Sequence, residues 1–169
     1  ICFIGERRFS DFLSRYVPPN PGSIETPEGL CLGEHPGLAY FTLGQRQGLG
    51  IGGLAGGLEA PWFVAAKDAA RNTLIVVQGH DHPLLLSQSL AASRMHWISG
   101  KPPCDPPFPC QARLRHRQPL QPCWIEEITG DQVRIRFSQP QRAVTPGQAA
   151  VVYLGEECLG GGIIETMES

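Results

Sequence analysis

The stretch that decides the fold is CWIEEITGDQVRIRF, residues 123–137. Cys123–Ile128 and Val133–Phe137 are short runs of the apolar, β-branched and aromatic residues that favour strands. Thr129-Gly130-Asp131 lies between the two runs and is typical of a tight turn. The stretch therefore predicts two strands joined by a turn.

Four more runs of the same kind surround these two strands. Turns such as Pro146-Gly147 and Leu154-Gly155-Glu156 separate them. The additional predicted strands are residues 93–98, 110–117, 149–153 and 158–165. Six short strands at regular spacing predict a small, closed, antiparallel β-barrel domain at residues 88–169.

Residues 1–82 predict a small α+β domain. Apolar residues at positions 9, 12, 13 and 16 follow helical spacing, and a proline-rich segment then ends the helix predicted over residues 6–16. The predicted strands flank the Pro27-Glu28-Gly29 turn and occupy residues 62–67 and 73–78. The fold is therefore expected to be mostly β, with a domain boundary between residues 80 and 90.

The composition limits the class of protein. The net charge of the 169 residues is −2, so no overall positive field attracts nucleic acid. No apolar run approaches the ~20 residues of a membrane span, and no membrane partner is expected. Six scattered cysteines indicate a reducing cytosol and no metal site. The chain starts without Met, and we expect it to be part of a longer polypeptide.

Cys2 is the first candidate functional residue. It lies just ahead of the predicted helix and beside Arg7 and Arg8. A helix N-terminus and neighbouring guanidinium groups lower the pKa of a thiol and make it reactive. The alternative is a small buried hydrophobic residue next to Phe3 and Ile4, and the local sequence leaves both interpretations open.

Arginines form the second candidate feature. Arg113, Arg115 and Arg117 alternate along one predicted strand, so their side chains are expected on one face. Arg134 and Arg136 repeat the pattern. Such stripes suit phosphate binding, but they equally suit an ordinary solvated barrel face.

Three weaker patterns favour structural explanations. Gly48–Gly53 matches G-x-G-x-x-G, but the following residues cannot form the helix that a dinucleotide site needs. His80-Asp81-His82 is better explained as a turn before Pro83 than as a metal site. A zinc module built from Cys104, Cys110 and Cys123 is a third and weaker possibility.

Longer motifs resemble one known family, the tRNA-specific 2-thiouridylases, also called tRNA-uridine 2-sulfurtransferases. The resemblance runs nearly end to end. The matching segments are residues 1–7, 33–37, 42–53, 61–64, 78–80, 115–118, 144–149 and 158–164.

The resemblance implies a three-part enzyme of which this chain is the central and C-terminal domains, the barrel being similar to the second domain of translation elongation factors. The missing N-terminal ATP-pyrophosphatase domain would bind ATP and adenylate the wobble uridine of tRNA. The implied partners are tRNA and a sulfur-relay donor protein, and the implied compartment is the cytoplasm. Alone, this chain is expected not to make 2-thiouridine, because no residue here matches an ATP site.

The resemblance also implies roles for single residues. Cys2 matches the family's second catalytic cysteine, which carries a persulfide and then forms a transient disulfide with an upstream cysteine that this chain lacks. Arg115, His116 and Gln148 match positions that contact tRNA, although the family often has Tyr in place of His116. The alternative function is a non-catalytic RNA-binding β-barrel module in which Cys2 is structural.

Overall fold

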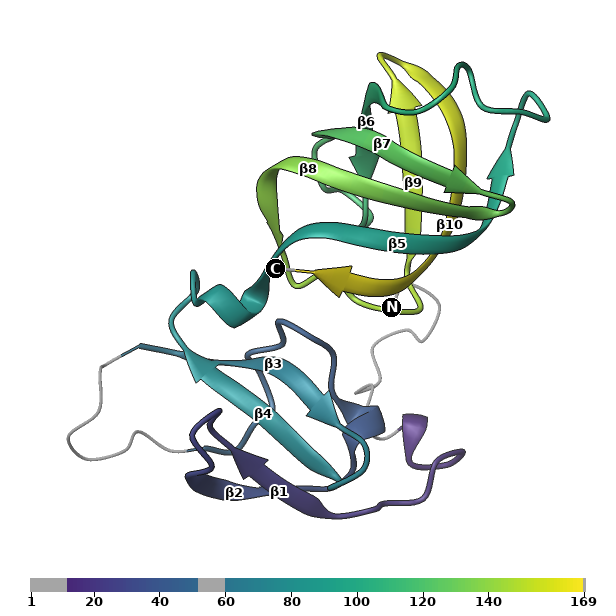
Figure 1. The fold of residues 1–169 in the computed structure, drawn as a ribbon. Coiled ribbons are helices and arrows are strands. Elements are labelled where there is room, and N and C mark those ends of the chain that lie inside the picture. Colours follow the sequence, from purple (N-terminus) through teal and green to yellow (C-terminus); the bar gives the residue numbers. More distant parts are fainter. Residues whose placement is uncertain (1–11, 52–59, 169) are drawn as a thin grey trace. The chain divides into compact units, whose positions relative to one another are not determined.

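The structure is a computed structural model that describes residues 12–51 and 60–168 (Figure 1). The chain divides into two compact units, residues 1–82 and 83–169. Strands dominate both units, which confirms the prediction of a mostly β protein. Cys2 and most of the predicted helix lie outside the described residues.

The first unit is built on a four-stranded sheet with the order β2-β1-β4-β3. Its strands are β1 (Gly22–Glu25), β2 (Cys31–His35), β3 (Trp62–Asp68) and β4 (Thr73–Gln78). The turn at residues 27–29 joins β1 to β2, as predicted, while β1 and β4 pair in parallel. A 3₁₀ turn, Leu38–Tyr40, follows β2.

The core of the first unit includes a buried histidine, His35, among apolar side chains. Ile24, Leu74 and Val76 are fully buried, and His35 is only 1% exposed. The imidazole Nε2 of His35 donates a hydrogen bond to the carbonyl oxygen of Asn72 at 3.1 Å. Because a buried polar group without a partner is costly, this bond satisfies one nitrogen of the buried imidazole, and it ties β2 to the β3–β4 turn.

The predicted N-terminal helix ends near the expected residue. Phe12 and Leu13 are helical, and the amide of Val17 donates to the carbonyl of Leu13 at 2.9 Å. The rings of Phe12 and Tyr16 lie 5.2 Å apart, as side chains four residues apart on a helix do. The prolines that follow cannot continue the helix.

The second unit is a closed six-stranded antiparallel barrel with the order β10-β5-β8-β7-β6-β9 (Figure 1). Its strands are β5 (Leu86–Trp97), β6 (Phe108–Arg113), β7 (Gln121–Thr129), β8 (Gln132–Arg142), β9 (Ala149–Leu154) and β10 (Glu157–Glu168). Each corresponds to one of the six predicted strands, so the barrel prediction is confirmed. The likeness to elongation factor domains stays a prediction.

Alternation along the strands fills the barrel. In β8, Val133, Ile135 and Phe137 are buried, while Arg134 and Arg136 between them are exposed. Strand β10 passes very close to β5, since a Cβ atom on Gly160 would lie 2.1 Å from the carbonyl oxygen of His96. No side chain fits in that space, so glycine is required where the two strands meet.

One predicted strand is wrong at its end. Strand β6 stops at Arg113 instead of continuing to residue 117. The amide of Leu114 donates to the side-chain Oε1 of Gln118 at 3.0 Å, and the amide of Gln118 donates to the carbonyl of Arg115 at 3.1 Å. These local bonds close a turn, and the left-handed backbone of Arg117 at φ 66° completes it.

Candidate functional site

Two loops leave the barrel at the same end. Strands β6 and β9 are paired, and the pair at this end is Arg113 with Val151. The loop at residues 114–120 follows Arg113, and the loop at residues 143–148 precedes β9. The sheet register therefore brings both loops to one end of the barrel, which we call the loop end.

Arg115 connects the two loops of the loop end. Its guanidinium Nη2 donates to the carbonyl oxygen of Ala143 at 2.5 Å. The hydroxyl of Thr145 donates to the same oxygen at 3.0 Å. Ala143 has a left-handed backbone with φ 52°, an uncommon conformation for alanine, so the surrounding bonds hold this carbonyl in a specific position.

A second positive charge lies near Arg115. The pKa of Arg115 is lowered, first by partial burial and second by the positive charge of Arg142, the last residue of β8. Both effects penalise the charged form of the guanidinium. The loop end therefore brings two guanidinium groups close together.

Three glutamines brace the loop at residues 114–120. Gln118, whose Oε1 closes the turn, donates from Nε2 to Oε1 of Gln141 at 3.1 Å. Gln141 is 6% exposed and donates in turn to Oε1 of Gln121 at 3.3 Å. Because these amides satisfy one another, they fix the loop against the end of β8.

His116 and Gln148 lie in the same two loops. His116 is exposed next to Arg115, and Gln148 is half-buried just before β9. The amide of Gln148 donates to the carbonyl of Thr145 at 3.2 Å, and its own carbonyl accepts from the amide of Ile164 at 2.8 Å. The fold therefore places Arg115, His116 and Gln148 at one end of the barrel. The stripe predicted for Arg113, Arg115 and Arg117 does not form along one strand, because β6 ends at Arg113.

The second arginine pattern has a different environment. Arg134 and Arg136 share the exposed face of β8, as predicted. Arg136 lies 3.4 Å from a carboxylate oxygen of Glu126, and Arg134 forms ion pairs with Glu126 and Glu168. This side face is already neutralised by its own carboxylates, which favours the interpretation as an ordinary solvated surface.

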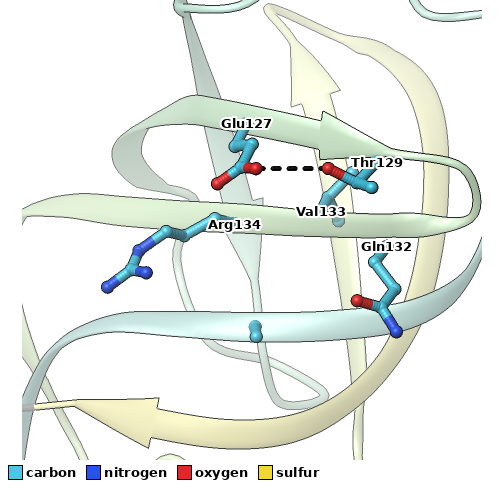
Figure 2. Close-up of a pocket in the computed structure, with 6 residues that line it drawn as sticks. Glu127, Thr129, Gln132, Val133 and Arg134 are labelled. Carbon is cyan, nitrogen blue, oxygen red and sulfur yellow. Dashed lines mark hydrogen bonds between the residues drawn. The ribbon is translucent and has the colours of Figure 1, made fainter.

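A shallow pocket on the side face supports this interpretation (Figure 2). Its lining residues are Ala91, Glu127, Thr129, Gln132, Val133 and Arg134. The hydroxyl of Thr129 donates to Glu127 at 3.2 Å, and Figure 2 shows Arg134 extending away from that bond. One carboxylate, Glu127, and one guanidinium, Arg134, line the pocket, so charges of both signs are present there.

The weaker sequence patterns do not correspond to a binding site among the residues that the structure describes. His80 bonds Asp81 at 2.8 Å in a turn. Among residues 12–51 and 60–168 no three potential metal ligands cluster, and Cys104 is exposed while Cys110 and Cys123 are buried. Residues 41–51 contain neither strand nor helix, so no strand leads into Gly48 as a dinucleotide turn requires.

Sequence reasoning missed Arg142 and Gln141 as members of the loop end. Both lie beyond Phe137, where the predicted strand stopped, whereas β8 continues to Arg142. The only signal in the sequence is that they precede the 144–149 segment.

In the described part of the chain no helix is long and apolar enough to cross a membrane.

Comparison with known proteins covers both units. The aminomethyltransferase beta-barrel domain family matches residues 87–164, and the tRNA methyl transferase PRC-barrel domain family matches residues 10–78. A tRNA-specific 2-thiouridylase MnmA from Tolumonas auensis is 58% identical over 165 residues, which are 98% of this chain and 44% of that protein. The corresponding protein from Methylococcus capsulatus is 57% identical over 98% of this chain and 45% of its own length. The one from Vibrio cholerae is 57% identical over 98% and 44%.

Proposed function

Because this chain belongs to the tRNA-specific 2-thiouridylase family and spans less than half the length of the relatives it matches, we propose that it is the tRNA-docking and sulfur-transfer part of such an enzyme. The reaction is conversion of the wobble uridine of tRNA into 2-thiouridine in the cytoplasm. In this proposal, ATP binding and uridine adenylation are the work of a part of the enzyme outside this chain.

The observation that carries the docking proposal is the bond between Arg115 and the Ala143 carbonyl. It holds one guanidinium at the junction of two loops, with the charge of Arg142 nearby. Guanidinium groups bind phosphates through parallel hydrogen bonds, and phosphate contacts supply much of the affinity for nucleic acid. The loop end therefore suits one phosphate group of the tRNA backbone.

His116 and Gln148 would add recognition beside the phosphate. An exposed imidazole can stack on an unpaired base or hydrogen-bond to it, and a side-chain amide can donate and accept. Their backbones are held by the turn after Arg115 and by β10, so little ordering is needed on binding.

Cys2 carries the sulfur in this proposal, although it lies outside the described residues. A donor protein that itself carries a persulfide transfers its outer sulfur to the thiolate of Cys2 and leaves as a thiolate, and Arg7 and Arg8 favour the thiolate form of Cys2. The terminal sulfur, directly or as hydrosulfide, attacks C2 of the adenylated uridine, and AMP leaves. In either route the thiolate of an upstream cysteine attacks Sγ of Cys2, breaks the persulfide S–S bond and leaves a disulfide. The chain alone is inactive because neither that cysteine nor an ATP site is part of it.

The docking proposal is tested by tRNA binding at several salt concentrations. Arg115→Ala should weaken binding by about tenfold, because it removes one phosphate contact. The slope of log affinity against log salt concentration should become shallower by about one. The control is Arg134→Ala on the side face, which should change affinity less than twofold. Equal losses in both variants would contradict the docking proposal.

The sulfur-transfer proposal is tested on nucleosides by mass spectrometry. Cells that lack their own enzyme would carry the full-length gene, either unchanged or with Cys2→Ser. Loss of 2-thiouridine with the serine supports the proposal. Persistence of 2-thiouridine would leave Cys2 structural and the chain a non-catalytic RNA-binding module.

A further inference from the structure

Cys110 and Cys123 form a thiol pair that the proposed function does not use. They are direct partners across β6 and β7, and both side chains point into the barrel. Their sulfur atoms lie 3.5 Å apart. Cys110 is 7% exposed and Cys123 is 1% exposed.

This geometry is close to that of a disulfide. Side chains of directly opposite residues in an antiparallel pair start about 4.5–5.5 Å apart at Cβ, near the 3.5–4.5 Å range of disulfides. The 3.5 Å between the two sulfurs must shorten by only ~1.5 Å to reach bonding distance. Small rotations of the side chains would supply this movement without separating the strands.

We propose that Cys110 and Cys123 are a reversible disulfide site that staples the hairpin of β6 and β7. The oxidant is hydrogen peroxide. The thiolate of one cysteine attacks the peroxide oxygen to give a sulfenic acid and one water molecule. The second thiol displaces the sulfenic oxygen as a second water molecule, and the S–S bond forms. A small dithiol reverses the reaction by exchange and is itself oxidised.

The environment of the two thiols assigns them different roles. Hydrogen bonding from Cys123 lowers the pKa of Cys110, whereas donation of that bond and burial raise the pKa of Cys123. Cys110 is also the more exposed of the two. Cys110 is therefore the residue that meets the peroxide, and Cys123 is the residue that resolves the sulfenic acid.

The staple lies at the base of the loop that carries Arg115 and His116. The loop at residues 114–120 is enclosed between Cys110 and Cys123 in the sequence. A covalent bond at its base would limit opening of the hairpin and keep the loop end assembled. This consequence for RNA rests on the proposed function, whereas formation of the disulfide does not.

Peptide mapping tests the disulfide itself. The 169-residue chain is treated with hydrogen peroxide, its remaining thiols are alkylated under denaturing conditions, and it is digested without reductant. A linked pair of peptides containing Cys110 and Cys123, lost after treatment with dithiothreitol, is the expected result. Recovery of the two cysteines only as alkylated or over-oxidised peptides would overturn the proposal.

Thermal unfolding provides a second measurement. Oxidation should raise the Tm of the barrel by about 10 °C, because the bond closes a short loop in the unfolded chain. Cys123→Ala should abolish this rise, and Cys104→Ala, which removes an exposed thiol, should keep it. A rise that persists in Cys123→Ala would contradict the assignment, and the peptide map of the unaltered chain decides the question if that variant does not fold.

Binding of tRNA separates this inference from the proposed function. Oxidised and reduced chains are compared with the same tRNA. Full affinity in the oxidised chain is expected, since the native hairpin is retained. If neither form binds tRNA while the linked peptides are present, docking fails and the disulfide stands. A disulfide that forms only when the barrel is denatured would overturn the inference.

Discussion

The loop end and the side face of the barrel both present arginines, but their surroundings differ. Arg115 lies near another arginine and is held by a backbone carbonyl. Arg134 and Arg136 lie against Glu126 and Glu168. A carboxylate neighbour offsets the charge of a guanidinium, while a second guanidinium adds positive charge nearby. Under the docking proposal, the partners of the arginines, more than their number, decide which surface binds nucleic acid.

Charge reversal at the loop end should have the largest effect. Arg115→Glu replaces attraction by repulsion at the phosphate and should lower tRNA affinity about a hundredfold. Arg136→Glu is the matched reversal on the side face and should lower affinity less than fivefold through general repulsion. Binding is measured at fixed ionic strength, with circular dichroism to verify folding. Comparable losses would remove the distinction between the two surfaces.

Removal of the second arginine should have a smaller effect. Arg142→Gln keeps a polar side chain of similar length but removes its charge, and tRNA affinity should fall about threefold with a shallower salt dependence. Arg134→Gln is the control on the side face. An unchanged salt dependence in Arg142→Gln would show that Arg115 acts alone.

Loss of the hydrogen bonds among the three glutamines should reduce tRNA affinity less than loss of Arg142, and it should also lower the Tm of the barrel. Gln141→Leu leaves Gln118 and Gln121 without their buried partner, so the Tm of the barrel should fall by a few degrees, about 1 kcal/mol. Affinity for tRNA should fall about twofold, because the loop must be ordered on binding. Gln139→Leu, at an exposed position on the same strand, is the control. An unchanged Tm would mean that the loop is held without the amides.

The smallest effect should come from the side face. Glu126→Gln removes a carboxylate that Arg134 and Arg136 share. Weak, salt-sensitive RNA binding should then increase by less than twofold, since these surface pairs are exposed and worth little individually. The control is Glu156→Gln in the turn between β9 and β10, which changes the net charge by the same amount. A decrease in Glu126→Gln would mean that this carboxylate organises a binding surface.

Local patterns in the sequence predict the existence of the barrel strands but not their ends. Val133–Phe137 alternates strictly, and the structure places its apolar residues inside. The end of β6 depends on a hydrogen bond from the Leu114 amide to the side chain of Gln118, which periodicity cannot reveal. The extension of β8 is hidden by Pro140, which normally ends a strand. It is tolerated because residues 138–140 fall in a register shift between the pairs Ser87–Gln141 and Ser89–Arg136.

In the candidate site, too, some residues could be predicted from the sequence and others could not. The resemblance to a known family indicated Arg115, His116 and Gln148, and the barrel brings their loops to one end. The single-strand arginine stripe was wrong, because the chain turns after Arg113. Arg142 was not predicted, since its neighbour in space, Arg115, is 27 positions away in the sequence and only the closed barrel joins them.

Closure of the barrel by β5 and β10 has a consequence for how the unit can be rearranged. The chain enters the barrel at Leu86 and reaches Glu168 on the neighbouring strand, where Glu168 pairs with Ser89. Entry and exit therefore lie side by side, so a short peptide could join them and the barrel could be circularly permuted. New termini at the Leu154-Gly155-Glu156 turn would leave every barrel strand whole. Such a permuted barrel would present the same loops, residues 114–120 and 143–148, from a chain that begins at a different strand.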